Sequence, residues 1–326
     1  MIALTLSTQS WELREPFVTA RDNLTHLPTL CVHLTGAGGH RGRGEAAGVD
    51  YAGETPQSMA AQLDRVRPHL RTDLTGEELL GLLPAGGARN ALDCALWDLR
   101  AKESGVSAAE RAGVAPLHPV ITAYTIGLGS EADTRRKARA SHGYPLLKLK
   151  VDAERHLDVV RIVREECAAA RLILDANQSW SRALLERLLP ALVGLGVELI
   201  EQPVRPEEEA SLAGLRSAIP LAADESCTDR SSLARLGCYQ YVNIKLDKCG
   251  GLTEAFALAE AAAARGLGLM VGNMCGSSLA MAPAFLIAQR CRYSDLDGPL
   301  LQSTDYEPPL RCAHGLLQPP ARALWG

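Results

Sequence analysis

Hydrophobic and polar residues follow one pattern up to about residue 115 and a different pattern after Val120. In the first part, residues 2–13 and 29–36 alternate apolar and polar side chains, as strands do. Residues 36–45, which follow the second strand, are rich in glycine and predict a hairpin turn. The chain is therefore expected to begin with strands joined by turns.

Two helices are predicted next. Residues 55–70 have apolar side chains at helical spacing, with Thr55 as the cap and Pro56 in the first position. Residues 86–105 repeat this spacing and end at Gly105, a residue typical of helix C-termini. Strands followed by helices predict an α+β unit that is separate from the rest of the chain.

After Val120, eight short apolar runs alternate with segments, most of them rich in alanine and leucine, that have helical periodicity. This alternation predicts a parallel (β/α) barrel, and an open doubly wound sheet is the alternative. No glycine-rich dinucleotide loop follows the first strand, which removes the usual reason to prefer the open sheet. The eight predicted strands lie in residues 120–127, 146–151, 171–177, 197–203, 219–226, 240–246, 267–274 and 293–298.

Three domain segments follow from these patterns. Residues 1–115 form the α+β unit and residues 116–298 form the barrel. Residues 299–326 are rich in proline and lack a crossover helix, so we expect them to return over the α+β unit.

Composition narrows the class of protein. The net charge of −4 and the isoelectric point near 6.1 give no reason to expect nucleic acid or a membrane as partner. The nine cysteines are scattered without a C-x-x-C pair, which suits reduced thiols. The N-terminal residues lack the features of a signal peptide, and no apolar run approaches the ~18 residues of a membrane span. We expect a soluble, cytoplasmic enzyme.

Charged residues end several of the predicted barrel strands. Asp175, Glu201 and Asp224 lie about one βα unit apart on consecutive strands. A single residue of this kind often only caps the following helix, but a series at equivalent positions predicts the C-terminal mouth, where barrel enzymes place their active sites. Three carboxylates without histidine or cysteine favour one Mg²⁺ ion. Asn177 and Glu225 are expected to support these ligands, although Glu225 equally suits a helix cap.

Lysines flank the carboxylates along the chain. Lys148 and Lys150 share one face of the preceding strand, and Lys245 ends the following one. A lysine beside a cation and another ammonium has a lowered pKa, suited to proton transfer. Bases on opposite sides of a metal-bound carboxylate predict a 1,1-proton transfer through an enediolate, meaning racemisation or epimerisation.

Five ordered motifs carry a family resemblance: "KLK", "LDANQSW", "IEQP", "ADES" and "VNIKLDKCGG". Together they resemble the enolase superfamily, muconate-lactonizing subgroup. The resemblance implies an α/β fold, a modified (β/α)7β TIM-like barrel whose capping domain is built from the N-terminal region and the C-terminal tail. It also implies Lys150 and Lys245 as the acid/base pair, Lys148 beside the substrate carboxylate, and often a homo-oligomer.

The end of the eighth strand bears on the substrate. Asp295 and Asp297 either cap a turn or bind an ammonium group, and their D-x-D pattern resembles the dipeptide epimerases. The segments around residues 83–99 and 242–255 are similar to the L-Ala-D/L-Glu epimerases of murein-peptide recycling. That resemblance implies that Thr125 lies near the dipeptide. Arg21 either pairs with a glutamate side chain or is a structural surface residue.

Other functions remain as alternatives. A muconate cycloisomerase or an o-succinylbenzoate synthase/N-acylamino acid racemase would share the scaffold, but those substrates leave Asp295 and Asp297 without a free amine to bind. A Schiff-base aldolase built on Lys150 or Lys245 leaves the three carboxylates unexplained. An inactive barrel that only binds a ligand has little use for both lysines and all three acids.

Overall fold

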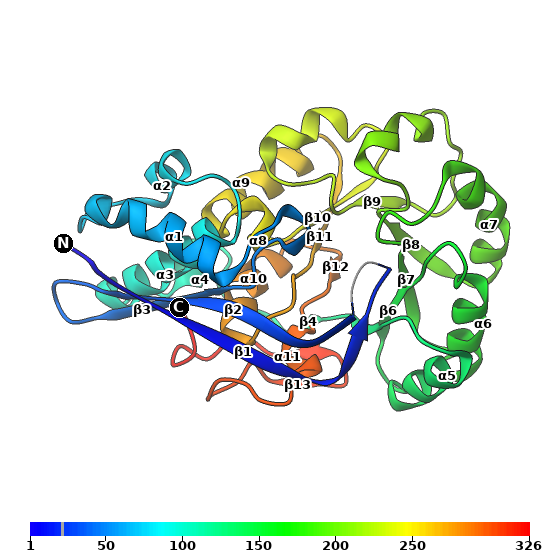
Figure 1. The fold of residues 1–326 in the computed structure, drawn as a ribbon, viewed down its shortest axis with the longest axis horizontal. Coiled ribbons are helices and arrows are strands. Elements are labelled where there is room, and N and C mark those ends of the chain that lie inside the picture. Colours follow the sequence, from blue (N-terminus) through cyan, green and yellow to red (C-terminus); the bar gives the residue numbers. More distant parts are fainter. Residues whose placement is uncertain (21–22) are drawn as a thin grey trace.

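The computed structural model describes residues 1–20 and 23–326, and its centre is an eight-stranded parallel sheet with strand order β5 to β12 (Figure 1). A parallel bridge between Thr122 and Ser294 joins β12 to the chain just before β5, which closes the sheet. This closure confirms the barrel over the open sheet. The strands are β5 (Tyr124–Ile126), β6 (Leu146–Lys150), β7 (Arg171–Asp175), β8 (Val197–Glu201), β9 (Leu221–Ala223), β10 (Tyr241–Ile244), β11 (Gly268–Val271) and β12 (Tyr293–Ser294).

The crossovers between these strands are α-helical except after β8 and β9. There the connections contain 3-10 segments of seven and six residues, η3 and η4. Segments this short span about two turns and cover less of the barrel than the other crossovers. The crossover elements are α5 (Glu131–Ala140), α6 (Leu157–Glu166), α7 (Arg182–Gly194), η3 (Pro206–Leu212), η4 (Arg230–Arg235), α8 (Leu246–Cys249), α9 (Leu252–Ala263) and α10 (Ser278–Ala288).

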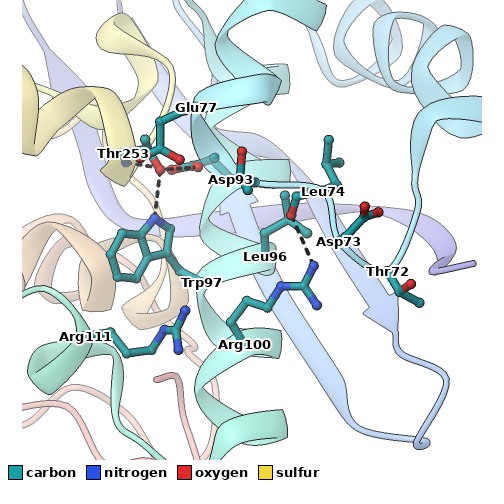
Figure 2. A pocket seen from close by; sticks show the side chains of 12 residues that line it. Thr72, Asp73, Leu74, Glu77, Asp93, Leu96, Trp97, Arg100, Arg111 and Thr253 are labelled. Atoms are coloured by element: carbon teal, nitrogen blue, oxygen red, sulfur yellow. Dashed lines mark hydrogen bonds between the residues drawn. The ribbon is translucent and has the colours of Figure 1, made fainter.

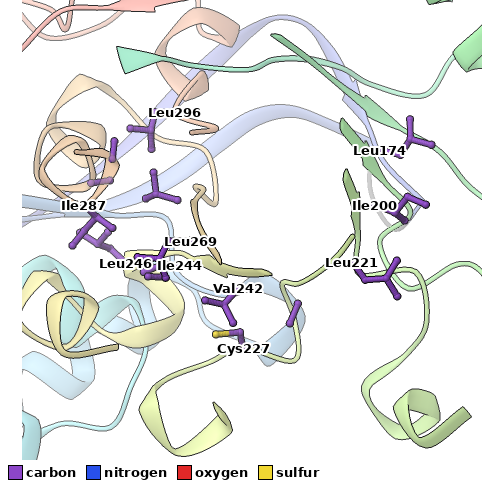
Figure 3. Packing of buried hydrophobic residues seen from close by; sticks show 14 of the residues in the cluster. Leu174, Ile200, Leu221, Cys227, Val242, Ile244, Leu246, Leu269, Ile287 and Leu296 are labelled. Atoms are coloured by element: carbon purple, nitrogen blue, oxygen red, sulfur yellow. The ribbon is translucent and has the colours of Figure 1, made fainter. Parts of the chain in front are cut away.

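Alternation along the strands divides their side chains between the barrel interior and the surrounding helices. Residues such as Leu174, Ile200 and Val242 point outward from the barrel and belong to the main core between the strands and the helices (Figure 3). The opposite parity forms a separate buried cluster made of Ala123, Leu146, Ile173, Leu199, Ala222, Met270 and Tyr293. This cluster fills the interior toward the N-terminal ends of the strands, and on most strands the same face turns from apolar to charged toward the C-terminal end.

The N-terminal unit is a three-stranded antiparallel sheet packed against α3 (Figure 1). β2 pairs with β3 from Thr35 opposite Arg41, so the predicted turn over 36–45 was too long and a third strand occupies its second half. Thr55 caps α1 as predicted, and Gly105 ends α3 with φ of 72°. The elements are β1 (Ala3–Val18), β2 (Asn23–Thr35), β3 (Arg41–Ala46), η1 (Asp50–Ala52), α1 (Pro56–Val66), η2 (Arg67–His69), α2 (Gly76–Leu82), α3 (Gly87–Ser104) and α4 (Ala108–Arg111).

Helix α3 docks this cap onto the barrel. Asp93 accepts hydrogen bonds from the backbone N–H and hydroxyl of Thr253 on α9, at 2.8 and 2.7 Å. Trp97 donates to the same hydroxyl at 2.9 Å, beside a cavity of about 340 Å³ (Figure 2). Arg89 donates to the carbonyls of Cys249 and Gly250. The cap and the barrel are therefore joined by buried polar contacts.

The C-terminal segment contacts the cap at several points. Trp325 donates from its indole to the carbonyl of Cys94, and the Gly326 N–H donates to Asp98 at 2.7 Å. Ser303 donates to the carbonyl of Glu12. These contacts support the proposed assignment of residues 299–326 to the cap. The elements here are α11 (Gly298–Leu301), β13 (Cys312–Ala313) and β14 (Leu316–Leu317). β14 pairs with β4 (Val120–Ile121), the strand that precedes the barrel.

Glu45 on β3 provides a test of the cap–barrel junction. Its buried carboxylate accepts from the Ser277 N–H and hydroxyl, and burial raises its pKa from 4.5 to about 7. A raised pKa means that ionisation destabilises the folded state as pH rises from about 4.5 to 7. The difference in unfolding free energy between Glu45→Gln and the wild type should therefore increase in favour of the variant, by up to about 3 kcal/mol, as pH rises over that range.

Urea unfolding of both proteins between pH 4.5 and 8 measures this difference. Subtracting the two curves cancels the titration of all other groups. A difference that does not change with pH would contradict the assignment of Glu45 as a buried acid with a raised pKa.

Candidate active site

The three predicted carboxylates meet inside the barrel mouth. Asp175 ends β7, Glu201 ends β8 and Asp224 follows β9, and each offers an oxygen within 4.8 Å of the others. All three side chains are buried. The Oε2 atom of Glu201 lies 2.8 Å from the Lys148 ammonium but accepts no well-formed hydrogen bond. A cluster of hard oxygen donors with a buried, unsatisfied oxygen is suited to holding a divalent cation.

Strand register accounts for this convergence, with one correction. Lys150, Asp175 and Glu201 are direct neighbours in register, whereas Glu201 pairs with Ala222 and so Asp224 lies two residues farther along. The expectation of equivalent positions was therefore wrong for Asp224. Strands in a closed barrel tilt and stagger, so a shift of two residues keeps the side chain on the same inner face and at the mouth.

The two lysines predicted to act as acid and base approach the carboxylates from opposite neighbouring strands. Lys150 Nζ lies 2.7 Å from Asp175 Oδ2 and 3.0 Å from Asn177 Oδ1. Lys245 Nζ lies 2.7 Å from Asp224 Oδ2. Both side chains line the same cavity. The geometry thus places one ammonium on each side of the carboxylate cluster.

Lys148 has a different environment from Lys150. Its Nζ lies 2.8 Å from both Glu201 and Asp295 and 3.2 Å from Asp175. Only 1% of the residue is exposed, against 8% for Lys150. Lys148 therefore joins the carboxylate cluster to the end of β12 and does not line the cavity.

Electrostatics in the cluster are dominated by burial and ion pairs. Burial favours the neutral form of Asp175, but Lys150 and Lys148 prevail and hold its pKa well below the usual range. Burial and the neighbouring Asp175 raise the pKa of Glu201 to about 8. Burial lowers the pKa of Lys245, yet Asp224 outweighs it and the net shift is upward. The upward shift reflects the carboxylates around the ammonium, and the lowering expected beside a bound cation stays a prediction.

Asn177 and Glu225 contact each other beside the cluster. Asn177 donates from its amide to Glu225 Oε1 at 3.3 Å, and its backbone N–H donates to Asp175 at 2.9 Å. Asn177 therefore orients both Lys150 and Asp175. The supporting role of Glu225 at the three carboxylates stays a prediction.

Two contacts of the carboxylate cluster were not predicted from the sequence. Lys248 Nζ lies 2.6 Å from Asp224 Oδ1 and also donates to the Asn243 carbonyl. The Asn243 amide donates to Glu201 Oε1 at 2.8 Å. Asn243 has the same strand parity as Lys245, which is a signal that identifies it as facing inward.

Asp295 and Asp297 lie at the far end of the cluster, next to Thr125. Asp295 pairs with Lys148, while Asp297 accepts from the Thr125 backbone N–H at 2.7 Å. Burial and the charge of Asp295 raise the pKa of Asp297 to about 7. Two buried carboxyl groups share one ammonium, that of Lys148, and this arrangement favours a second positively charged group, such as an ammonium, at this position. Arg21, the residue predicted to contact the substrate side chain, lies outside the described residues.

A cavity of about 220 Å³ lies between the barrel mouth and the cap. Its barrel wall includes Lys150 and Lys245, and its cap wall includes Phe17. Phe17 and Thr125 also line a smaller cavity of about 140 Å³. The remaining lining residues of the larger cavity are Thr19, Leu24, Leu27, Pro28, Ala47, Gly48, Asp50, Glu54, Thr55, Pro56, Asn177, Asn273, Met274 and Cys275. The cap therefore covers the part of the barrel mouth that holds Lys150 and Lys245 and restricts the size of a substrate.

Two relatives, one named an epimerase and one a racemase, match most of the chain. The L-Ala-D/L-Glu epimerase of Escherichia coli is 41% identical over 312 residues, covering 95% of this chain and 97% of that protein. An N-acetyl-D-glutamate racemase of Pseudoalteromonas is 44% identical over 250 residues, covering 76% and 79%.

Solved structures match equally well. An enolase family member from Agrobacterium tumefaciens, with homology to dipeptide epimerases and bound sodium and L-Ala-L-Glu, superposes with a TM-score of 0.96 at 38% identity over the full length of both chains. A dipeptide epimerase from Methylococcus capsulatus, complexed with Mg and L-Arg-D-Lys, has a TM-score of 0.89 at 32% identity, covering 99% of this chain and 98% of that one.

Two family models divide the chain between them. Residues 1–113 match the mandelate racemase/muconate lactonizing enzyme N-terminal domain. Residues 131–323 match the enolase C-terminal domain-like model. The motifs, the capped barrel and these matches agree, and the chain belongs to the mandelate racemase/muconate lactonizing enzyme family of the enolase superfamily.

Proposed function

We propose that this protein is a Mg²⁺-dependent dipeptide epimerase that acts on L-Ala-D/L-Glu. The observation that carries the proposal is the placement of Lys150 and Lys245 on opposite sides of three buried carboxylates, in one covered cavity. The 41% identity to an enzyme of this activity over 95% of the chain supports the same substrate.

In this proposal Asp175, Glu201 and Asp224 would hold one ion. Mg²⁺ bound there supplies positive charge beside the substrate carboxylate and lowers the pKa of nearby ammoniums. Relatives complexed with Mg, such as the Methylococcus enzyme, support this choice of metal.

The two lysines perform the proton transfer. One lysine, in its neutral form, removes the α-proton of the C-terminal residue and leaves a planar enediolate. The other lysine, as an ammonium, delivers a proton to the opposite face. The reverse reaction exchanges their roles. Lys148 supports this step by holding positive charge between the carboxylate cluster and Asp295.

Asp295 and Asp297 bind the free N-terminal amine in this proposal, with Thr125 holding Asp297 in place. Asp297→Asn should weaken binding of the free dipeptide, because it removes a buried charge that faces the ammonium. We expect a rise of about 10-fold or more in KM with a smaller change in kcat. Steady-state kinetics on L-Ala-L-Glu measure this split. An equal loss on N-acetyl-L-Ala-L-Glu would instead indicate a structural role for Asp297.

A second candidate is racemisation of an N-acylated amino acid, because the Pseudoalteromonas relative is an N-acetyl-D-glutamate racemase. Such a substrate lacks the free amine that the two acids at β12 favour. Incubation with a dipeptide library and with N-acetylglutamate in deuterated water, followed by mass spectrometry, separates the two functions. Deuterium uptake confined to N-acetylglutamate would overturn the dipeptide proposal.

The cellular role belongs to the same proposal. Epimerisation of L-Ala-D-Glu would serve the metabolism of murein peptides in the cytoplasm, and the nine cysteines, all free in the structure, suit that compartment. Among the described residues, no helix has the length and apolar character needed to cross a membrane.

A further inference from the structure

Lys245 is held differently from Lys150. Lys150 ends a five-residue strand between two neighbouring strands, and its ammonium contacts Asp175 and Asn177 within the barrel. Lys245 lies one residue beyond β10, at the N-cap of the four-residue helix α8. The position of Lys245 therefore depends on what holds α8 as well as on its own contact with Asp224.

Both ends of α8 are held by the cap. At its start, Asp247 is 5% exposed, and its Oδ1 accepts from the Gly48 N–H at 2.8 Å. At its end, the carbonyls of Cys249 and Gly250 accept from Arg89 on α3. The hydrogen bond to Gly48 is the one closest in sequence to Lys245, two residues away.

Gly48 belongs to a cap loop with little freedom to move. Glu54 accepts from the backbone N–H groups of Val49 and Gly87, at 2.8 and 2.9 Å, which closes residues 49–54 on themselves and on α3. Gly48 has φ of +80°, and a Cβ there would lie 3.1 Å from Met59 Sδ. A loop closed in this way gives Asp247 a fixed point to bind.

The same loop forms a wall of the cavity. Gly48, Asp50 and Glu54 line it together with Lys245. The hydrogen bonds of Asp247 with the Gly48 N–H and with the Asn90 side chain on α3 thus link the wall that covers the substrate to the segment that carries one base.

We propose that Asp247 is a positioning residue that holds Lys245 against the substrate, so that the cap controls one of the two faces of proton transfer. The proposal rests on the proposed two-base function. Asp247 touches no reacting atom and acts only through α8. Lys150, held by the sheet, does not depend on this contact.

The test follows α-proton exchange in deuterated water for each substrate diastereomer separately. Lys245→Ala first identifies the diastereomer whose proton Lys245 removes, since exchange of that diastereomer should be lost. Asp247→Ala should then reduce exchange of the same diastereomer by about 10²-fold, the size of effect expected for a base displaced by about 1 Å. Exchange of the other diastereomer should stay within a few-fold of wild type.

Two variants and a control sharpen the result. Asp247→Asn keeps an acceptor for Gly48 and should restore most of the exchange. Asp247→Ser, whose hydroxyl is too short to reach Gly48, should reproduce the asymmetry if the alanine variant does not fold. Asp93→Ala is the matched control, because Asp93 is also a buried carboxylate between cap and barrel but bonds to α9.

Equal losses for both diastereomers, or the same asymmetry in Asp93→Ala, would overturn the role of Asp247. Failure of the proposed function looks different, because wild-type protein would then exchange no dipeptide α-proton. If N-acetylglutamate proves to be the substrate, the role of Asp247 is tested by measuring α-proton exchange of its two enantiomers separately.

Discussion

Replacing either Lys150 or Lys245 with alanine is expected to reduce epimerisation by about 10³-fold or more, since each supplies a proton-transfer step that no other group can perform. Each variant should still exchange the α-proton of one stereoisomer, because the remaining base serves one face. The structure supports this separation: Lys150 contacts Asp175, and Lys245 contacts Asp224 on the other side of the cluster. Circular dichroism follows epimerisation, and mass spectrometry in deuterated water follows exchange.

Lys102→Ala is a suitable control for these variants. Lys102 also forms an ion pair with a buried carboxylate, Asp98, at 2.7 Å, but on α3 in the cap. It should leave the turnover unchanged. Epimerisation at the wild-type rate in Lys150→Ala or Lys245→Ala would mean that the two-base assignment is wrong.

Exhaustive chelation is the second change with a large expected effect. Removing the cation should abolish epimerisation, and adding Mg²⁺ should restore it, because the cation would supply the positive charge that stabilises the enediolate beside three closely spaced carboxylates. A readout that does not depend on activity is thermal stability. Mg²⁺ added to metal-free protein should raise Tm, since it binds only the folded site.

Glu201→Gln separates this effect from general salt stabilisation. The amide keeps an oxygen for the Asn243 donor but removes the charge, so the rise in Tm on adding Mg²⁺ should be much smaller. Glu45→Gln is the matched control, because Glu45 is equally buried but lies outside the carboxylate cluster. Full activity after chelation, or an unchanged rise in Tm in Glu201→Gln, would remove Mg²⁺ from the proposal.

Much of the fold followed from local patterns. The eight apolar runs after Val120 all contain a strand, and the predicted helix boundaries at Thr55 and Gly105 agree with the structure. Strand alternation also placed Lys148 and Lys150 on the inner face, where both contact Asp175. These features depend on residues close in sequence, so a single sequence carries them.

Other features depended on long-range packing. The strand β3 replaced half of the predicted turn because residues 41–46 gain a partner in β2 and a neighbour in α3. The upward pKa shift of Lys245 follows from its contact with Asp224, which no pattern around Lys245 reveals. The contact of Lys248 with Asp224 was missed for the same reason.

By itself, the sequence determined the chemistry available to this protein. It determined three carboxylates and the lysines beside them, each at the inner face of a barrel strand, because parity and spacing are local properties of the chain. Only the tertiary structure decided the pairings: the stagger that brings Asp224 to Glu201, and the cap contact that reaches from Gly48 to Asp247. Contacts between residues that far apart exist only once the barrel has closed and the cap has packed on it, so no local pattern can encode their geometry.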